Sequence, residues 1–230
     1  PIQRIIVALG VMVAVGTSTS FSRCNGKHDF EKARKVLKNG FSLSYSVMIL
    51  LTITVLLFGD KILIMLGSSE NVLPLAKEYL YLVIFGSVFL SMTLFISHVM
   101  ISLGNPKMSI ISTSIGAITN IVLDFILVTK QGMGVEGAAI ATTISQIAGF
   151  AYAYYQYRKV TKEYNMNFKF EIDKKVALSI ITVGISAFVI EAEDGILMAV
   201  LNNLLASTVG DSGIVVLGVI SKVYMFLSIC

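Results

Sequence analysis

The sequence predicts an all-α, polytopic helical membrane protein with about seven transmembrane helices, and two observations lead to this fold class. Hydrophobic residues make up 55% of the 230-residue chain and charged residues 14%, with a mean hydropathy of +0.81. A soluble domain carries about 25% charged residues. Apolar runs long enough to cross a ~30 Å hydrocarbon layer also recur along the whole chain. Because they lack the short alternating pattern of barrel strands, we expect helices.

Turns and charged loops divide these runs into successive elements. The tetrapeptide from Gly104 to Lys107 has the residue chemistry of a tight turn, and so does Gly210-Asp211. Small residues at Gly10 and Gly16 of the first span predict close contact with a neighbouring helix. A helical glycine lowers the local helix preference, so Gly184 is predicted to end a short interfacial helix at 176–185. The predicted spans are 2–21, 33–58, 72–103, 108–128, 135–157, 186–209 and 212–230.

The basic residues predict the orientation of these spans. Loops after the first, third and fifth spans hold 13 Lys and Arg residues, whereas the opposite side holds four. The positive-inside rule therefore predicts that the protein lies in the cell membrane with the side carrying these 13 basic residues facing the cytoplasm. It also accounts for the net charge of +4, so we expect no nucleic-acid partner. Cys24 and Cys230 are far apart and are predicted to be free thiols, with neither a disulfide nor a metal site.

A hairpin at 120–142 carries the strongest candidate site. Asp124 and Thr142 each lie nine positions from the turn residue Met133. At about 1.5 Å per residue both are roughly 13 Å from the turn, near the middle of the bilayer. Asn120 lies one helical turn before Asp124 on the same face. Since a charge at this depth is expensive and by default marks function, Asp124, Asn120 and Thr142 are predicted to form a proton- or cation-binding site.

A second acidic group lies in the predicted helix 186–209. Glu191 and Asp194 are three residues apart and share a face, whereas Glu193 points elsewhere. A carboxylate face with thioether and amide groups suits a cationic organic molecule, although the same stretch also fits a water-exposed helix mouth. The candidate substrate-binding residues are Glu191, Asp194, Met198, Asn202 and Gln146.

Six segments then resemble one family, the multidrug and toxic compound extrusion (MATE) transporters, in its bacterial multidrug efflux branch. They are AVGTSTSFSRCNGKHDFEKA, LGSSENVLPLAKEYL, ISLGNPKMS, NIVLDFILV, GMGVEGAAIATTIS and LNNLLASTVGD, in order along nearly the whole chain. The resemblance implies a twelve-helix, two-lobe transporter of which this chain is a fragment. Residues 1–160 would form helices two to six of the N-terminal lobe, 161–175 the inter-lobe linker, and 176–230 the start of the C-terminal lobe.

The resemblance also implies a function. The family uses proton- or sodium-driven antiport, and Asn120, Asp124 and Thr142 match positions that contribute to its cation site. The family's partner aspartate lies on helix one, outside this chain. We therefore expect a secondary active antiporter, monomeric when complete, that exports amphipathic cationic drugs in exchange for protons or sodium ions. We expect no cofactor, and no metal beyond sodium at Asp124.

Two alternatives remain open from the sequence. One is a lipid-linked oligosaccharide flippase of the same superfamily, which would place cationic residues in the central cavity for a pyrophosphate. Away from their ends, the spans here are acidic or neutral apart from Lys222. The other is a non-transporting membrane fragment. An enzyme is not expected, because the sequence contains no nucleophile elbow, phosphate loop or metal-ligand cluster.

Overall fold

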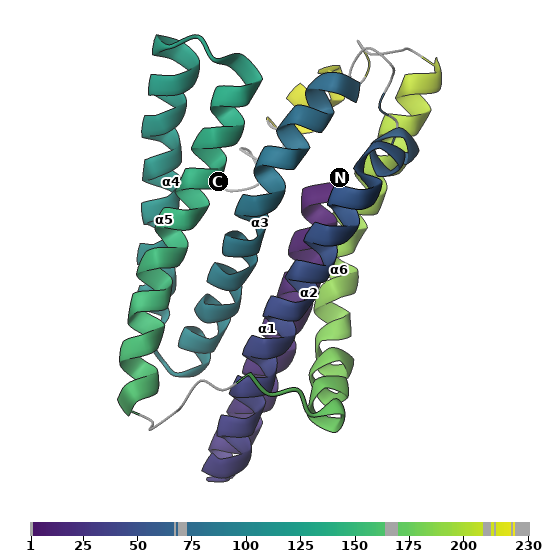
Figure 1. Cartoon of the computed structure of the whole chain (residues 1–230). Helices are drawn as coiled ribbons and strands as arrows, with labels where there is room; N and C mark the ends of the chain where they lie inside the picture. Colours follow the sequence, from purple (N-terminus) through teal and green to yellow (C-terminus); the bar gives the residue numbers. More distant parts are fainter. Residues whose placement is uncertain are drawn as a thin grey trace.

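The computed structural model describes residues 2–66, 68, 73–163, 170–208, 213, 215–221 and 223, and within this part every regular element is a helix. Among the residues that the structure describes, five helices are long and apolar enough to cross a membrane: α1, α2, α3, α4 continued through η1, and α6. The predicted all-α polytopic fold is therefore confirmed. The elements are α1 (Ile2–Gly26), α2 (Phe30–Met65), α3 (Leu73–Ser102), α4 (Pro106–Asp124), η1 (Phe125–Lys130), α5 (Gly134–Glu163) and α6 (Lys174–Thr208) (Figure 1).

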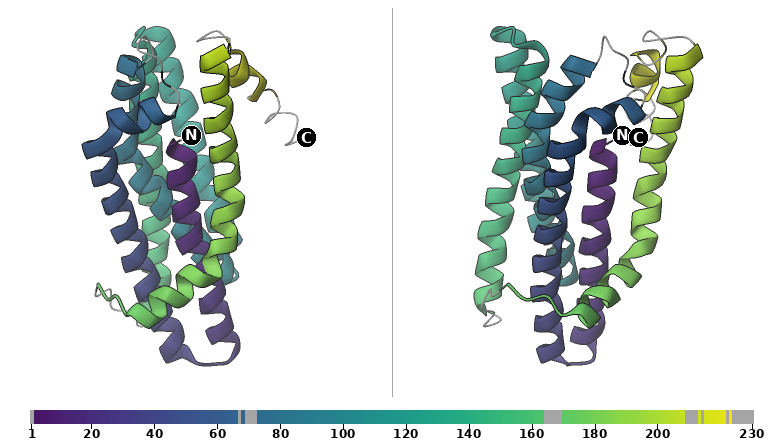
Figure 2. Two further views of the ribbon diagram at one scale, coloured as in Figure 1. Left: turned by 90° about the vertical axis from the view of Figure 1, so that its right-hand side faces the viewer. Right: turned by 45° about the vertical axis from the view of Figure 1, so that its right-hand side comes forward.

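Helix α1 lies at the centre of the bundle. It packs against α2, α3 and α6, while α5 packs against α3 and α4 (Figures 1 and 2). The α4–α5 hairpin is thus at one side and α6 at the other. Helix α5 is 30 residues long, but its hydroxyl and amide side chains make it less apolar than the five spans. The core that joins these helices includes Val13, Leu37, Phe95, Tyr157 and Ile180.

Helix α2 is longer than predicted. The sequence predicts a helix at 33–58 and a loop containing Asp60 and Lys61, whereas the structure continues the helix to Met65. At its start, the Asp29 carboxylate accepts a hydrogen bond from the Lys32 backbone N–H at 3.1 Å, which caps the helix one turn earlier. At its end, Asp60 pairs with Lys77 of α3 at 2.8 Å. Both charged groups reach the surface from helical positions, so no loop is needed to expose them.

The predicted break at Gly184 is wrong, because α6 is one continuous helix. A Cβ atom on Gly184 would collide with the backbone carbonyl of Met12 on α1, and a Cβ on Gly16 would collide with the carbonyl of Ile180 on α6. Gly184 therefore serves close packing of two helix backbones and does not end a helix. The predicted packing role of Gly16 is confirmed. The last predicted span, 212–230, lies largely outside the described residues, as do residues 164–169 of the predicted linker.

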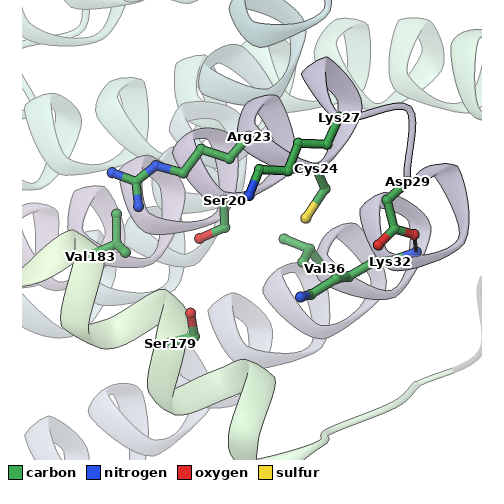
Figure 3. Close-up of a pocket in the computed structure, with 9 residues that line it drawn as sticks. All are labelled: Ser20, Arg23, Cys24, Lys27, Asp29, Lys32, Val36, Ser179 and Val183. Atoms are coloured by element: carbon green, nitrogen blue, oxygen red, sulfur yellow. Dashed lines mark hydrogen bonds between the residues drawn. The ribbon is translucent and has the colours of Figure 1, made fainter.

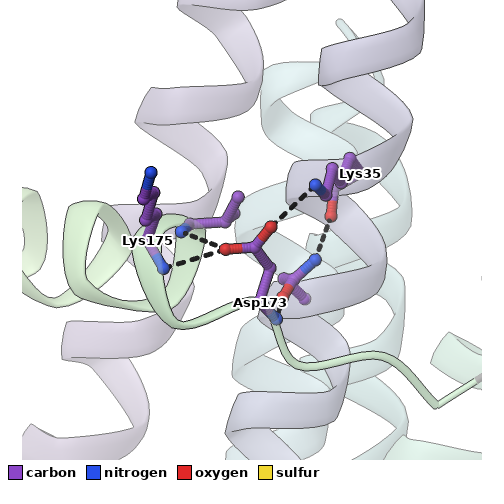
Figure 4. Close-up of polar contacts among 5 residues, drawn as sticks. Lys35, Asp173 and Lys175 are labelled. Atoms are coloured by element: carbon purple, nitrogen blue, oxygen red, sulfur yellow. Dashed lines mark hydrogen bonds and ion pairs between the residues drawn. The ribbon is translucent and has the colours of Figure 1, made fainter.

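The segment 170–173 is attached to one face of α2 immediately before α6 begins (Figure 4). The Asp173 carboxylate lies 2.7 Å from the Lys35 ammonium, and the Asp173 backbone N–H donates to the Asn39 side-chain oxygen. One turn further along α2, the Ser42 hydroxyl accepts the Glu171 backbone N–H at 3.0 Å. These contacts join two segments more than 125 positions apart in the chain.

Asp173 also caps α6, and this predicts a pH effect. Its carboxylate accepts the N–H groups of Lys175 and Val176 at 2.9 and 3.4 Å. The Lys35 hydrogen bond, followed by these backbone hydrogen bonds, lowers the pKa of Asp173. The stabilising contribution is therefore fully present above the usual carboxyl pKa of about 3.9, and is lost as the pH falls through the lower folded value.

Replacing Asp173 by Ala should open the start of α6, because the cap and the ion pair are both lost. Asp173→Asn should have a smaller effect, since Asn still caps helices well. Hydrogen exchange of a peptide covering 174–178 measures the opening. Asp60→Ala is the control, because it removes the exposed Lys77 pair and does not touch α6. Equal protection of 174–178 in all four proteins would contradict the assignment.

Candidate functional site

A cavity of about 290 Å³ lies between α3, α4 and α5. Asn120 of α4 and Thr142 of α5 both line it, so the two arms of the hairpin contribute to one space. Gln146 lies one turn beyond Thr142 and lines the same cavity. The remaining lining residues are Leu90, Thr93, Ser112, Thr113, Gly116, Ala117, Ser145 and Gly149.

Glycines allow the helices around this cavity to approach each other closely. A Cβ on Gly149 of α5 would lie 3.0 Å from the Ser112 carbonyl oxygen of α4. A Cβ on Gly116 would lie 3.4 Å from the Ser145 carbonyl oxygen. On the α3 side, a Cβ on Gly86 would collide with the Gln146 side-chain oxygen. The small residues thus bring backbone and side-chain oxygens to the cavity wall.

The hydroxyl groups of the cavity present acceptors. Thr142 donates its proton to the Ala138 carbonyl at 2.8 Å, and Ser145 donates to the Thr142 carbonyl at 2.7 Å. Ser112 donates to the Ser109 carbonyl at 2.9 Å. Because each proton is directed to a carbonyl of the same helix, the hydroxyl oxygen keeps its lone pairs for another group. Such a wall favours a cation or a hydrogen-bond donor.

Asp124 is half-buried and lies at the last residue of α4, one turn beyond Asn120. It is not among the cavity-lining residues, and within the described chain it makes no hydrogen bond to Asn120 or Thr142. Its Oδ1 atom is buried without a hydrogen-bond partner in the described structure, as are Nδ2 of Asn120 and Oε1 of Gln146. Buried polar atoms are almost always paired, so each unpaired one requires an explanation such as a function. The cation-binding role of the three predicted residues remains a prediction.

The chain changes from an α-helix to a π-helix immediately after Asp124. Gln131 N–H donates to the Ile126 carbonyl at 3.0 Å, five residues back, and Met133 N–H donates to the Leu127 carbonyl at 3.0 Å. Short π-helical segments often occur at functional sites. The sequence predicts a regular helix over 108–128. The π-helix itself has the sequence FILVTK, which contains neither Pro nor Gly. The sequence therefore gives no signal for it.

The acidic residues of α6 lie away from this cavity. Helix α6 contacts α1 and α2, whereas the cavity is formed by α3, α4 and α5. The structure therefore does not bring Gln146 together with the rest of the predicted substrate set. Asp194 is exposed, and its carboxylate lies 3.5 Å from the Arg4 guanidinium of α1. Glu191 is half-buried. Met198 and Asn202 are half-buried further along α6.

Comparison with known proteins places this chain among transport proteins. A family model described as MatE matches residues 1–126. The multidrug export protein MepA of Staphylococcus aureus (strain NCTC 8325) is 28% identical over 207 residues, covering 90% of this chain and 46% of that protein. MepA of Staphylococcus haemolyticus is 30% identical over 230 residues, covering 98% of this chain and 50% of that protein. The chain spans about half the length of these relatives.

The fold comparison agrees with the sequence comparison. A solved structure described as the inward-facing conformation of a multidrug resistance MATE family transporter of the MOP superfamily superposes with a TM-score of 0.86 and 25% identity. The match covers 97% of this chain and 51% of that structure.

Proposed function

Because the chain belongs to the MatE family of multi-pass membrane transporters, we propose that it forms part of a secondary active antiporter. The antiporter exports amphipathic cationic drugs in exchange for protons or sodium ions. The observation that carries this proposal is the buried, unpartnered Asp124 oxygen, one helical turn beyond Asn120, which lines a cavity walled with acceptor oxygens. An acid in this environment gains a partner when it binds a proton or a cation.

The coupling follows from the charge of Asp124. When it is ionised, the half-buried carboxylate is costly in the low-dielectric interior. A proton on the carboxyl group removes that charge, and a sodium ion shared with the oxygens of Asn120 and Thr142 compensates it. The cation-loaded and empty forms then favour exposure of the site to opposite sides of the membrane. Rocking of the two lobes against each other gives this alternating access. A cationic drug competes for the same negative charge or favours the opposite orientation.

The cavity gives no support to a flippase for lipid-linked oligosaccharides. None of its lining residues is Lys or Arg, and such a lipid carries an anionic pyrophosphate. An acceptor-rich wall without cations would repel that group. Cationic organic molecules fit the same wall.

Transport by reconstituted protein tests the proposal. The protein encoded by the longest reading frame that contains this chain is reconstituted into proteoliposomes. A pH gradient and a sodium gradient are then imposed in separate experiments. We expect one of the two gradients to drive accumulation of a fluorescent cationic dye, and an ionophore that dissipates it to stop transport. A neutral dye of similar size is the control. Dye movement that responds to neither gradient would contradict antiport.

A further inference from the structure

A second cavity, of about 220 Å³, lies where the end of α1, the start of α2 and the first turns of α6 meet. By the distribution of basic residues this end of the bundle faces the cytoplasm. Three cationic side chains and one carboxylate line the cavity, so its net charge is +2. The lining residues are Ser20, Arg23, Cys24, Lys27, Asp29, Lys32, Val36, Ser179 and Val183 (Figure 3).

The cations of this pocket, Arg23, Lys27 and Lys32, come from three different turns of the chain. The side chains of Lys27 and Lys32 both extend into the space between α1 and α2, and Arg23 lies on the α6 side near Val183 (Figure 3). Within the described residues, none of the three has a carboxylate at ion-pair distance. Three like charges around one cavity repel each other, so an anion between them is stabilised.

The only acid of the pocket lining is already engaged. The Asp29 carboxylate accepts the Lys32 backbone N–H at 3.1 Å, as the cap of α2. Its single negative charge leaves two of the three positive charges of the lining uncompensated. The hydroxyls of Ser20 and Ser179 supply neutral donors on two further sides of the space. Arginine, lysine and hydroxyl groups together are the donors that bind phosphate oxygens.

We propose that this pocket binds a phosphate group at the cytoplasmic face of the membrane. Val36 and Val183 form an apolar part of the lining. A phosphate here therefore has an apolar surface beside it. Basic pockets between transmembrane helices on the cytoplasmic side are known to hold anionic lipid headgroups. The phosphate comes either from such a headgroup or from a soluble phosphate ester. This proposal does not depend on the transport function.

Lipid retention measured by native mass spectrometry tests the pocket. The purified chain in detergent is mixed with phosphatidylglycerol or phosphatidylcholine, and the bound lipid is counted. We expect wild type to retain phosphatidylglycerol preferentially. The triple variant Arg23→Gln, Lys27→Gln, Lys32→Gln should bind it on the order of 10-fold more weakly. The control triple variant Lys107→Gln, Arg158→Gln, Lys159→Gln removes the same charge outside the pocket, and should bind as wild type.

A second arm distinguishes the two phosphate sources. Calorimetric titration of inorganic phosphate and glycerol phosphate into lipid-free protein measures soluble ligands. Binding of these ligands by wild type and not by the pocket variant assigns a soluble ester, and preference for phosphatidylglycerol without such binding assigns a lipid. If the triple variant does not fold, the single variant Lys27→Gln is measured instead, because this side chain is exposed. It should bind more weakly than wild type. Equal binding by the pocket and control variants, or no preference over phosphatidylcholine together with no phosphate binding, would overturn the proposal.

Discussion

Replacement of Asp124 by Asn is expected to abolish coupled drug export while the protein still folds. Asn has nearly the same shape, so the end of α4 and the following π-helix keep their packing. The Asn side chain carries no negative charge and cannot take up a proton, so neither a proton nor a sodium ion keeps its binding site. Cells that express the variant from the longest reading frame encoding this chain should be as drug-sensitive as cells with the empty vector. Asp124→Glu, which keeps the charge, should retain part of the transport.

The matched control for this prediction is Glu136→Gln. Glu136 is the other acid of the hairpin, and it is exposed at the start of α5. Its replacement should leave drug resistance unchanged. Membrane expression of each variant is measured by immunoblot, and the transport rate in proteoliposomes under the active gradient. Normal drug resistance of the Asp124→Asn protein at wild-type expression would refute the coupling role.

Placing a single methyl group between α1 and α6 is expected to destabilise the bundle strongly. In Gly16→Ala the new Cβ meets the Ile180 carbonyl, and in Gly184→Ala it meets the Met12 carbonyl. The obstacle in each case is helix backbone, which cannot rotate away as a side chain could. Overpacking of this kind costs roughly 1–3 kcal/mol or more. Thermal unfolding of the purified chain in detergent should show a lower midpoint for each variant.

Gly26→Ala is the control for this packing prediction. Gly26 is the last residue of α1, and a Cβ there has no neighbour within 4 Å. Its effect should stay within about 0.5 kcal/mol, as for most surface substitutions. If Gly16→Ala and Gly184→Ala unfold at the wild-type temperature, the two helices are not as close as the structure places them.

The fold class was predictable because membrane insertion depends on long apolar runs, which are local in sequence. Helix ends were less predictable, since charged residues such as Asp60 and Lys61 occur equally in loops and at helix surfaces. The interpretation of Gly184 as a break failed for a related reason. A glycine lowers helix preference locally, but here the backbone contact with Met12, nearly 175 positions away, decides the structure.

The candidate site was partly predictable. Counting from the turn of the hairpin predicted that Asp124 and Thr142 lie at the same depth, with Asn120 one helical turn from Asp124. In the structure Asn120 and Thr142 both line one cavity. The position of Asp124 outside that lining was not predictable, because the lining depends on how α3, α4 and α5 pack together. The split between Gln146 and the acids of α6 depends on which helices pack together. Contacts of that kind are set by tertiary structure.

The close contact between α1 and α6 has a mechanical consequence for a two-lobe transporter. If 176–230 begins the second lobe, as its resemblance implies, that lobe starts with a helix fastened to the first one. The contacts that hold it begin with Asp173 against α2. They continue along α6 with Gly184 against Met12 of α1 and end with Gly195 beside Arg4 of α1. The first helix of the second lobe, α6, would then move together with α1 as one rigid body. Any pivot between the lobes would have to lie beyond Gly195.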